Sequence, residues 1–555
     1  MNAKLLLVSS LEKVFLDEEP RAFDGRIEGF QNEPVSFQAA WKCADEGFTR
    51  DYARIRVESP IADAVRVRLV KNVAVSYPTL ADADDYYLRK TPGLYPDRLS
   101  EIQAERVRIW GGAWQSAWLD VEADESLPAG VYPIDVILSD ASGEELARAR
   151  AEYRRIAAKL PDQTLIRTQW FHNDGLCHYY GVEVFSEEYW TIVENFLTTA
   201  AKRGINCVLT PIHTPPLDTG VGLERMTCQL VDVEKLDSGY AFRFDRLRRW
   251  VETAERAGMQ WFEMAHLFTQ WGAKHAPKIV ATVNGEEKRI FGWDTDATGE
   301  EYVSFLRCYI PALIEELNAL GIADRCIFHV SDEPNQACLD EYMAARNIVS
   351  PLLEGFPMID ALSDVQFYHS GAVTHPVPAC NHIRPFLDAN IPDLWTYYCV
   401  GQYKDVTNAF IAMPSARTRI LGVQLFKYHI AGFLQWGYNF YNSQYSEYPI
   451  DPYATNDGDG FTPAGDCFIV YPGPGGKPEE SIRLMTMSEA MYDLRALQML
   501  EWLRGYDFVM SLVEADGVTV EFDRYPKGAN YLLSLRRRVN AEIEKALSGD
   551  WWNGL

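Results

Sequence analysis

Two different rhythms of apolar and polar residues divide the chain. In residues 1–155, short segments alternate apolar and polar positions and are separated by turn residues. A period of two is typical of strands that bury one face. This region is therefore predicted to be an antiparallel β-sandwich whose first strand lies within Met1–Ser10. Its other clear strand candidates are Ser36–Cys43, Ala53–Glu58, Ala64–Val70 and Gly130–Leu138.

From residue 156 onward, apolar runs alternate with stretches of helical periodicity, which favours parallel strands connected by helices. The predicted strands are Leu165–Phe171, Ile205–Ile212, Gln260–His266, Cys326–Ser331, Met358–Ser363, Leu394–Val400, Gly432–Tyr438 and Cys467–Tyr471. The predicted helices lie near 187–203, 243–258, 301–320, 337–353, 415–430 and 479–502. About eight such units is the number in a (β/α)8 barrel. Residues 156–502 are therefore predicted to form a TIM-type barrel, in a multidomain chain with an all-β and an α/β part.

Three other segments complete the predicted organisation. Two long inserts, Asp218–Gly239 and Lys274–Thr298, follow the second and third predicted strands and are expected to be active-site loops. The segment between the fifth and sixth strands is rich in Pro and His and is predicted to be an irregular connection. Residues 503–555 contain a strand-like run, Gly517–Phe522, and a helix near Asn530–Leu547. They are predicted to be an extension that packs on the barrel.

Charge and cysteine content narrow the function classes. The 53 basic and 79 acidic residues give a formal charge of −26, which disfavours nucleic acids and anionic membranes as partners. The ten cysteines form no Cys-x-x-Cys pair, so buried thiols are expected rather than disulfides or a zinc site. No apolar run is long enough for a membrane span or a usual signal peptide, so a cytoplasmic location is expected. No cofactor is expected, and the oligomeric state stays open, with a homodimer as one option.

The most informative stretch is an apolar run, Cys326–Val330, that soon ends in the adjacent acids Asp332 and Glu333. Pro334 then interrupts regular strand pairing. Carboxyls at the rim of an apolar barrel are partly desolvated and lie close together, and both effects raise the pKa of one of them. The pair is therefore predicted to be catalytic. The alternative is that these acids only cap the helix that follows.

The adjacency of the two acids favours one reaction over another. Two-carboxylate glycosidases place their acids on opposite sides of the scissile bond, which neighbouring residues do poorly. Adjacent acids suit a sugar whose own 2-acetamido oxygen attacks the anomeric carbon. In that reaction Asp332 would orient the amide and Glu333 would donate and later retake a proton.

Polar and aromatic residues also gather at the ends of the other predicted strands, where a barrel binds its ligand. Aromatic faces stack on sugar rings, although filling the core accounts for most of the 15 Trp and 29 Tyr. No metal site is predicted, because the histidines match no metal-binding spacing. The predicted substrate-binding residues are Trp170, His172, His213, His266, Gln270, Trp271, Tyr397, Tyr398, Trp436, Asn439, Tyr441 and Asp466.

Several of these segments carry a resemblance to a known family. They are His266–Gly272, His329–Pro334, Leu394–Tyr398 and Gly432–Asn439, together with Gly465–Asp466, Tyr471–Gly473 and Ser481–Leu484. From about residue 160 to 500 the chain resembles glycoside hydrolase family 123, the β-N-acetylgalactosaminidases, and the related domains of unknown function.

The resemblance implies that the chain releases terminal β-linked N-acetylgalactosamine. By that resemblance Asp332 positions the acetamido group, Glu333 is the acid/base, and Tyr397 or Tyr398 helps to hold the amide. It also implies that Trp436, Asn439, Tyr441 and Asp466 line the subsite for the terminal sugar. Galactosamine rather than glucosamine rests on the resemblance alone.

Two other functions stay open at this point. The first is a retaining two-carboxylate glycosidase on another sugar, with Glu333 as acid/base and Glu263 or Asp364 as nucleophile. The second is a barrel that binds carbohydrate without catalysis.

Overall fold

The computed structural model describes residues 3–43, 52–103 and 106–549. The chain divides into two compact units. The first consists of Met1–Gln163, Tyr403–Lys427 and Glu479–Leu555, and the second of Thr164–Gln402 and Tyr428–Pro478. The predicted domain boundaries differ from this division. The prediction placed residues 403–427 and 479–502 in the barrel, whereas both segments belong to the first unit.

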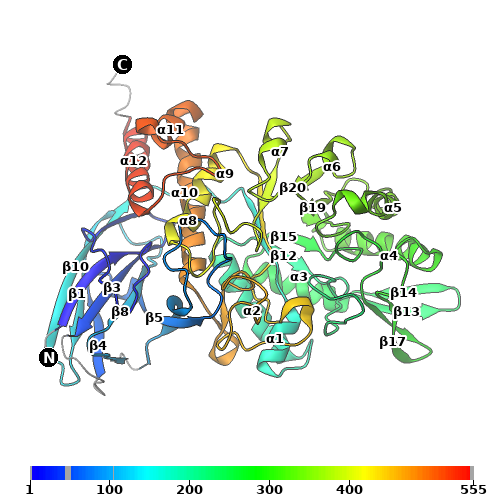
Figure 1. The fold of residues 1–555 in the computed structure, drawn as a ribbon, viewed down its shortest axis with the longest axis horizontal. Helices are drawn as coiled ribbons and strands as arrows, with labels where there is room; N and C mark the ends of the chain where they lie inside the picture. The colour runs from blue at the N-terminus through cyan, green and yellow to red at the C-terminus, as the bar shows by residue number, and fades with distance from the viewer. Residues whose placement is uncertain (1–2, 44–51, 104–105, 550–555) are drawn as a thin grey trace. The chain divides into compact units, whose positions relative to one another are not determined.

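The first unit contains two five-stranded sheets (Figure 1). The first sheet has the order β1 (Ala3–Ser9), β3 (Val35–Cys43), β8 (Trp114–Val121), β5 (Val65–Val75), β6 (Gly93–Glu101). The second has the order β2 (Arg26–Phe30), β10 (Glu145–Ile156), β9 (Gly130–Ser139), β4 (Tyr52–Glu58), β7 (Arg106–Arg108). Neighbouring strands are antiparallel except β2 and β10. Phe37 and Leu119 of one sheet share a buried core with Val136 of the other. The predicted antiparallel N-terminal region is confirmed.

The first unit also contains the C-terminal helices. They are α8 (Ser415–Arg419), α9 (Leu421–Lys427), α10 (Ile482–Arg504), α11 (Tyr506–Val513) and α12 (Ala529–Ser548). Arg536 of α12 binds Glu33 and Asp493 at 2.6 and 2.9 Å. The prediction of a strand at Gly517–Phe522 is wrong. Asp516 and Gly517 have φ angles of 58° and 77°, which turn the chain where a strand would need extended backbone.

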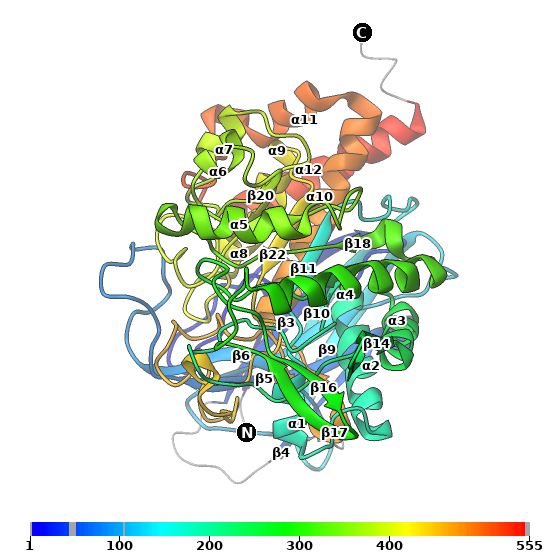
Figure 2. The same ribbon diagram turned by 90° about the vertical axis from the view of Figure 1, so that its right-hand side faces the viewer.

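The second unit is built on a parallel sheet of six strands. Their order is β18 (Cys326–Ile327), β15 (Trp261–Met264), β12 (Cys207–Thr210), β11 (Ile166–Gln169), β22 (Gly432–Gln435), β21 (Trp395–Tyr397). A further parallel pair is formed by β19 (Ile359–Ala361) and β20 (His375–Val377). Single parallel bridges join Phe328 to Met358 and Ala379 to Tyr397. Figure 2 shows α4, α5 and strands of this sheet in one view.

Two strand predictions in this unit are corrected. The Pro- and His-rich segment supplies β20, whose strand signal was masked by Pro376, a residue without a backbone donor. Cys467–Tyr471, predicted as the eighth barrel strand, does not join the parallel sheet. Phe468 instead bridges Asn439 in the antiparallel sense, and only Tyr471–Pro472 forms a short strand, β23.

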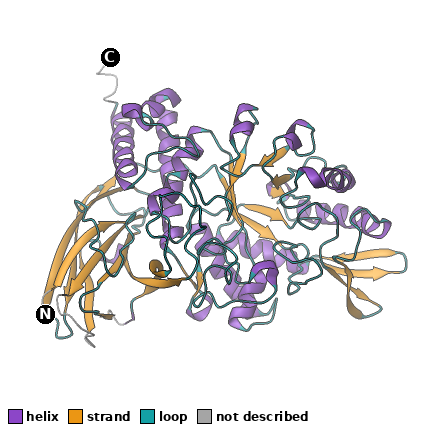
Figure 3. Ribbon diagram, in the orientation of Figure 1, coloured by secondary structure: helices purple, strands orange, loops and turns teal. Residues whose placement is uncertain are grey.

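Helices and two inserts complete the second unit (Figure 3). The helices are α1 (Asn173–Tyr180), α2 (Glu187–Lys202), α3 (Asp245–Ala257), α4 (Glu300–Ala319), α5 (Leu339–Val349), α6 (Gln366–His369) and α7 (Arg384–Asp388). The inserts supply β13 (Asp232–Leu236), β14 (Gly239–Arg243), β16 (Ile279–Val283) and β17 (Glu286–Phe291), which form one sheet. Among the described residues, no helix has both the length and the apolar character needed to cross a bilayer.

Candidate active site

The Asp332–Glu333 pair lies just beyond the carboxyl end of β18, between that strand and α5. The side chain of Asn335, not of either acid, accepts a hydrogen bond from Ala337 N (3.0 Å) and caps the turn that precedes α5. The pair therefore does not serve as the helix cap, and that alternative loses its support.

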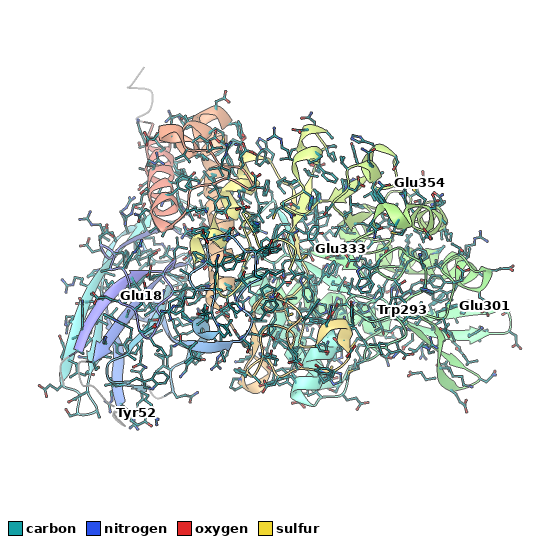
Figure 4. The ribbon with its side chains drawn as sticks, viewed as in Figure 1. Glu18, Tyr52, Trp293, Glu301, Glu333 and Glu354 are labelled. Carbon is teal, nitrogen blue, oxygen red and sulfur yellow. The ribbon has the colours of Figure 1, made fainter. Side chains whose placement is uncertain are left out.

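Glu333 is held in an unusual conformation (labelled in Figure 4). Its φ angle is 46°, in the left-handed region that residues other than Gly, Asn and Asp rarely adopt. The Tyr397 hydroxyl donates a 2.8 Å hydrogen bond to its Oε1. Strained backbone of this kind costs on the order of 1–3 kcal/mol and gathers at functional sites. The hydrogen bond from Tyr397 holds the Glu333 carboxyl in place.

Asp332 is half-buried beside Glu333. Burial raises the pKa of its carboxyl well above the ordinary value, and the Glu333 charge raises it further, while His329 acts in the opposite direction. Both effects disfavour the ionised form of Asp332. A carboxyl whose pKa is raised in this way is typical of a functional site.

The pair opens into a cavity of about 240 Å³. Seven of the predicted site residues line it: Trp170, Gln270, Trp271, Asp332, Glu333, Tyr397 and Trp436. They come from the ends of five parallel strands or from the loops that follow them. Aromatic side chains and two carboxyls around a space of this size can hold a sugar ring.

The other seven predicted residues are buried and do not line the cavity. His172 binds the carbonyl of Trp436 (2.9 Å), and the Asn439 side chain pairs with the backbone of His172. The Tyr441 hydroxyl donates to the Val470 carbonyl (2.9 Å). These side chains satisfy backbone groups of the site's walls.

The remaining four residues support the site in other ways; they are His213, His266, Tyr398 and Asp466. His213 binds the backbone carbonyl of His266 (2.8 Å), and Tyr398 packs edge-on against Phe433. Asp466 accepts a 3.0 Å hydrogen bond from Trp436 Nε1 and so fixes a ring that does line the cavity.

A buried network of charges lies next to the pair in sequence and in space. His329 Nε2 binds Glu263 Oε1 (2.6 Å), and its Nδ1 lies 3.4 Å from Asp360 Oδ1. These two carboxylates outweigh burial and raise the pKa of His329 to about 9. Trp170 Nε1 also donates to Glu263 (2.8 Å), which ties the network to the cavity wall.

This network also bears on a metal. His266, His329 and Asp360 are buried with their ligand atoms within 4.8 Å of one another. The two imidazole rings are stacked, with centroids 4.1 Å apart and planes at 24°. Imidazole lone pairs lie in the ring plane, so stacked rings do not aim at one common ion. The arrangement fits a stacked histidine pair rather than a metal centre.

Sequence reasoning missed three polar residues that line the cavity, Asp218, Gln444 and Tyr445. Burial raises the pKa of the Asp218 carboxyl to about 6, although Arg225 and the Tyr445 backbone amide act against that shift. Asp218 opens an insert that was expected to be an active-site loop, which was the available signal. Nothing in the local pattern distinguished Tyr445. The apolar remainder of the lining includes Leu217, Ala361, Val400, Leu434 and Phe461.

Comparisons with known proteins give one family match and one close match of the fold. A model of the glycoside hydrolase 123 catalytic domain matches residues 170–500. A family 123 glycoside hydrolase from Clostridium perfringens, described in terms of glycolipid glycan hydrolysis, has a TM-score of 0.72 at 12% identity. That match covers 99% of this chain and 98% of the other. No curated protein matches the chain.

Two further solved structures are much less similar. A putative β-galactosidase from Bacteroides fragilis has a TM-score of 0.33 at 8% identity, over 86% of this chain and 60% of the other. A β-glucuronidase from Parabacteroides merdae has a TM-score of 0.30 at 9% identity, over 88% and 52%.

Proposed function

This chain belongs to glycoside hydrolase family 123 and is therefore a glycosidase, and from that premise we propose that it releases terminal β-linked N-acetylgalactosamine. The sugar's own 2-acetamido group acts as the nucleophile. The observation that supports this most is the placement of two adjacent carboxyls, Asp332 and Glu333, on one cavity. Galactosamine is chosen over glucosamine because of the family alone.

In the first step Glu333 donates its proton to the glycosidic oxygen. The acetamido carbonyl oxygen bonds to the anomeric carbon as the bond to the leaving group breaks, which gives an oxazolinium ion. Asp332 accepts a hydrogen bond from the amide N–H and stabilises the positive charge. The amide hydrogen bond favours the ionised form of Asp332, which is the form that this step needs.

In the second step water attacks the anomeric carbon and Glu333 takes a proton from it. The bond between the anomeric carbon and the amide oxygen breaks, so the acetamido group is restored. Two displacements at one carbon give net retention of configuration. Tyr397 orients the Glu333 carboxyl through its 2.8 Å hydrogen bond in both steps.

The geometry of the site changes which residue could be the nucleophile in the two-carboxylate alternative. Glu263 is fully buried and bound to His329 and Trp170, and Asp364 does not line the cavity. Within the described part of the chain, Asp218 is the one further carboxyl that lines the cavity. A nucleophilic carboxylate would therefore have to be Asp218, and such an enzyme would not need a 2-acetamido group on its substrate.

We also propose that the parallel strands of the second unit close into a (β/α)8-type barrel. The support is that the two ends of the six-stranded sheet, β18 and β21, are each bridged to the β19–β20 pair. In such a barrel the Asp332–Glu333 pair occupies the carboxyl-terminal rim, where barrel enzymes place their catalytic residues.

A set of three 4-nitrophenyl glycosides tests the proposed function. The unmodified protein is expected to hydrolyse the β-N-acetylgalactosaminide with kcat/KM at least 100-fold above that for the β-galactoside, since the latter lacks the nucleophile. The β-N-acetylglucosaminide reports which epimer the site prefers. Comparable rates on the plain galactoside would favour the two-carboxylate reaction, and no turnover of any of the three would favour a non-catalytic binder.

A further inference from the structure

Two aromatic rings lie exposed at the cavity. Trp271 is 41% exposed and Tyr445 is 38% exposed, and both line the cavity that holds the Asp332–Glu333 pair. Their ring centroids are 5.9 Å apart with the planes at 88°. Trp170, which lines the same cavity, is 3% exposed. The cavity therefore has a buried inner wall and an exposed aromatic rim.

Both rim residues have strained backbone. Trp271 and Tyr445 have φ angles of 61° and 60°, in the region that ordinary side chains avoid. Trp271 N donates to the Asp332 carbonyl (3.0 Å), and Tyr445 N donates to Asp218 Oδ2 (3.1 Å). Strain of this kind persists only where surrounding contacts hold it, and it is typical of ligand-binding positions. The bond to Asp332 places the Trp271 backbone directly beside the catalytic pair.

Asp218 gives the rim a polar group. Its backbone N–H donates to Gln270 Oε1 (2.6 Å), which fixes the loop against the segment that carries Trp271. Its Oδ2 accepts the Tyr445 amide, and within the described residues its Oδ1 accepts no hydrogen bond. A carboxylate with an open oxygen beside two rings matches a sugar, whose C–H faces stack on rings and whose hydroxyls donate to carboxylates.

We propose that Trp271, Tyr445 and Asp218 bind the leaving group, and that this leaving group is an uncharged sugar; the proposal rests on the function proposed above. The terminal amino sugar occupies the inner part of the cavity, because a volume of about 240 Å³ holds little more than one ring. The next sugar then meets the exposed rim. Three carboxyls on one cavity, Asp218, Asp332 and Glu333, disfavour a leaving group that carries a carboxylate or a sulfate.

Two substrates with the same amino sugar test the proposal. One is a disaccharide in which N-acetylgalactosamine is β-linked to galactose, and the other is the β-fluoride of N-acetylgalactosamine, which has no leaving-group ring. Trp271→Ala and Tyr445→Ala are expected to lower kcat/KM for the disaccharide by about 10–100-fold, with at least a tenfold smaller loss for the fluoride. Turnover of the fluoride by each variant shows that its reacting centre is intact.

Matched controls and a third substrate complete the test. Trp502→Ala and Tyr448→Ala remove rings that are 82% and 48% exposed and lie outside the cavity lining, so neither should change either rate. A disaccharide whose second ring is a uronic acid should react at least tenfold more slowly than the neutral one, and Asp218→Asn should narrow that gap.

The outcomes separate this inference from the proposed function. Equal losses on the fluoride and the disaccharide, or no loss on the disaccharide, would overturn the leaving-group assignment while the proposed function stands. Preference for the uronic acid substrate would overturn the assignment of an uncharged leaving group. Failure of the unmodified protein to hydrolyse both the fluoride and the neutral disaccharide would overturn the proposed function and this inference with it.

Discussion

Glu333→Gln is expected to lower kcat for a natural disaccharide by about 10²–10⁴-fold, the usual contribution of a general acid. The amide of Gln cannot donate a proton to the glycosidic oxygen. For an aryl glycoside whose phenolate leaves without protonation, the loss in the first step should be much smaller. The measurement is kcat and KM for the two substrates with the variant and the unmodified protein.

The control for this variant is Glu354→Gln, the same change at an exposed glutamate (both positions are labelled in Figure 4). It should leave both rates unchanged. An equal loss on the disaccharide and the aryl glycoside would argue against Glu333 as the proton donor. Full activity on the disaccharide would remove it from the mechanism.

Asp332→Asn is expected to lower kcat by a similar factor on both substrates, because each reaction needs the amide to be oriented and the oxazolinium charge to be stabilised. A leaving group that departs without protonation does not replace either contribution. If the variant retained activity on the aryl glycoside while losing it on the disaccharide, Asp332 would be acting in proton transfer instead.

The same substitution should stabilise the folded protein at neutral pH. Burial and Glu333 raise the pKa of folded Asp332 above the value of about 3.9 expected in an unfolded chain. The unfolded state therefore binds fewer protons between these two pKa values, and this group's contribution to stability falls as pH rises through that range. Asn carries no charge to bury. The melting temperature of Asp332→Asn should exceed that of the unmodified protein at pH 7, and the difference should close toward pH 4.

Lost activity with raised stability would show that the variant is folded and that Asp332 belongs to a functional site, where stability is given up for charge placement. A variant that is both inactive and less stable at pH 7 would contradict the burial and pairing described for this carboxyl.

The apolar pattern predicted most of the second unit, because long helices such as α2, α3 and α4 are periodic and the short buried strands lie in continuous apolar runs. The pattern failed at β20, where a proline masked the strand signal. It also failed at Cys467–Tyr471, which is apolar because it packs against the chain that follows β22. Apolar runs show that a segment is buried, but not which neighbour buries it.

The candidate site was predictable to the same limited extent. The pair Asp332–Glu333 could be predicted because two adjacent acids near the end of an apolar run are unfavourable unless they have a role. His172 and Asn439 looked equivalent to Trp170 and Trp436 in sequence, yet they bind backbone groups behind the cavity. Tyr445 was not predicted, since its place on the cavity depends on a φ angle of 60° in a long loop. Side-chain direction at a strand end, and loop conformation, are set by tertiary contacts that local pattern does not contain.

The central claim is that the substrate's acetamido oxygen attacks its own anomeric carbon. The most direct test is kcat/KM for three aryl β-galactosaminides that carry acetyl, monofluoroacetyl and trifluoroacetyl groups on nitrogen. Each added fluorine weakens the carbonyl oxygen as a nucleophile and changes its size only slightly. The account predicts a steep fall along the series, by orders of magnitude from first to last, and rates that stay level across the three substrates would contradict it.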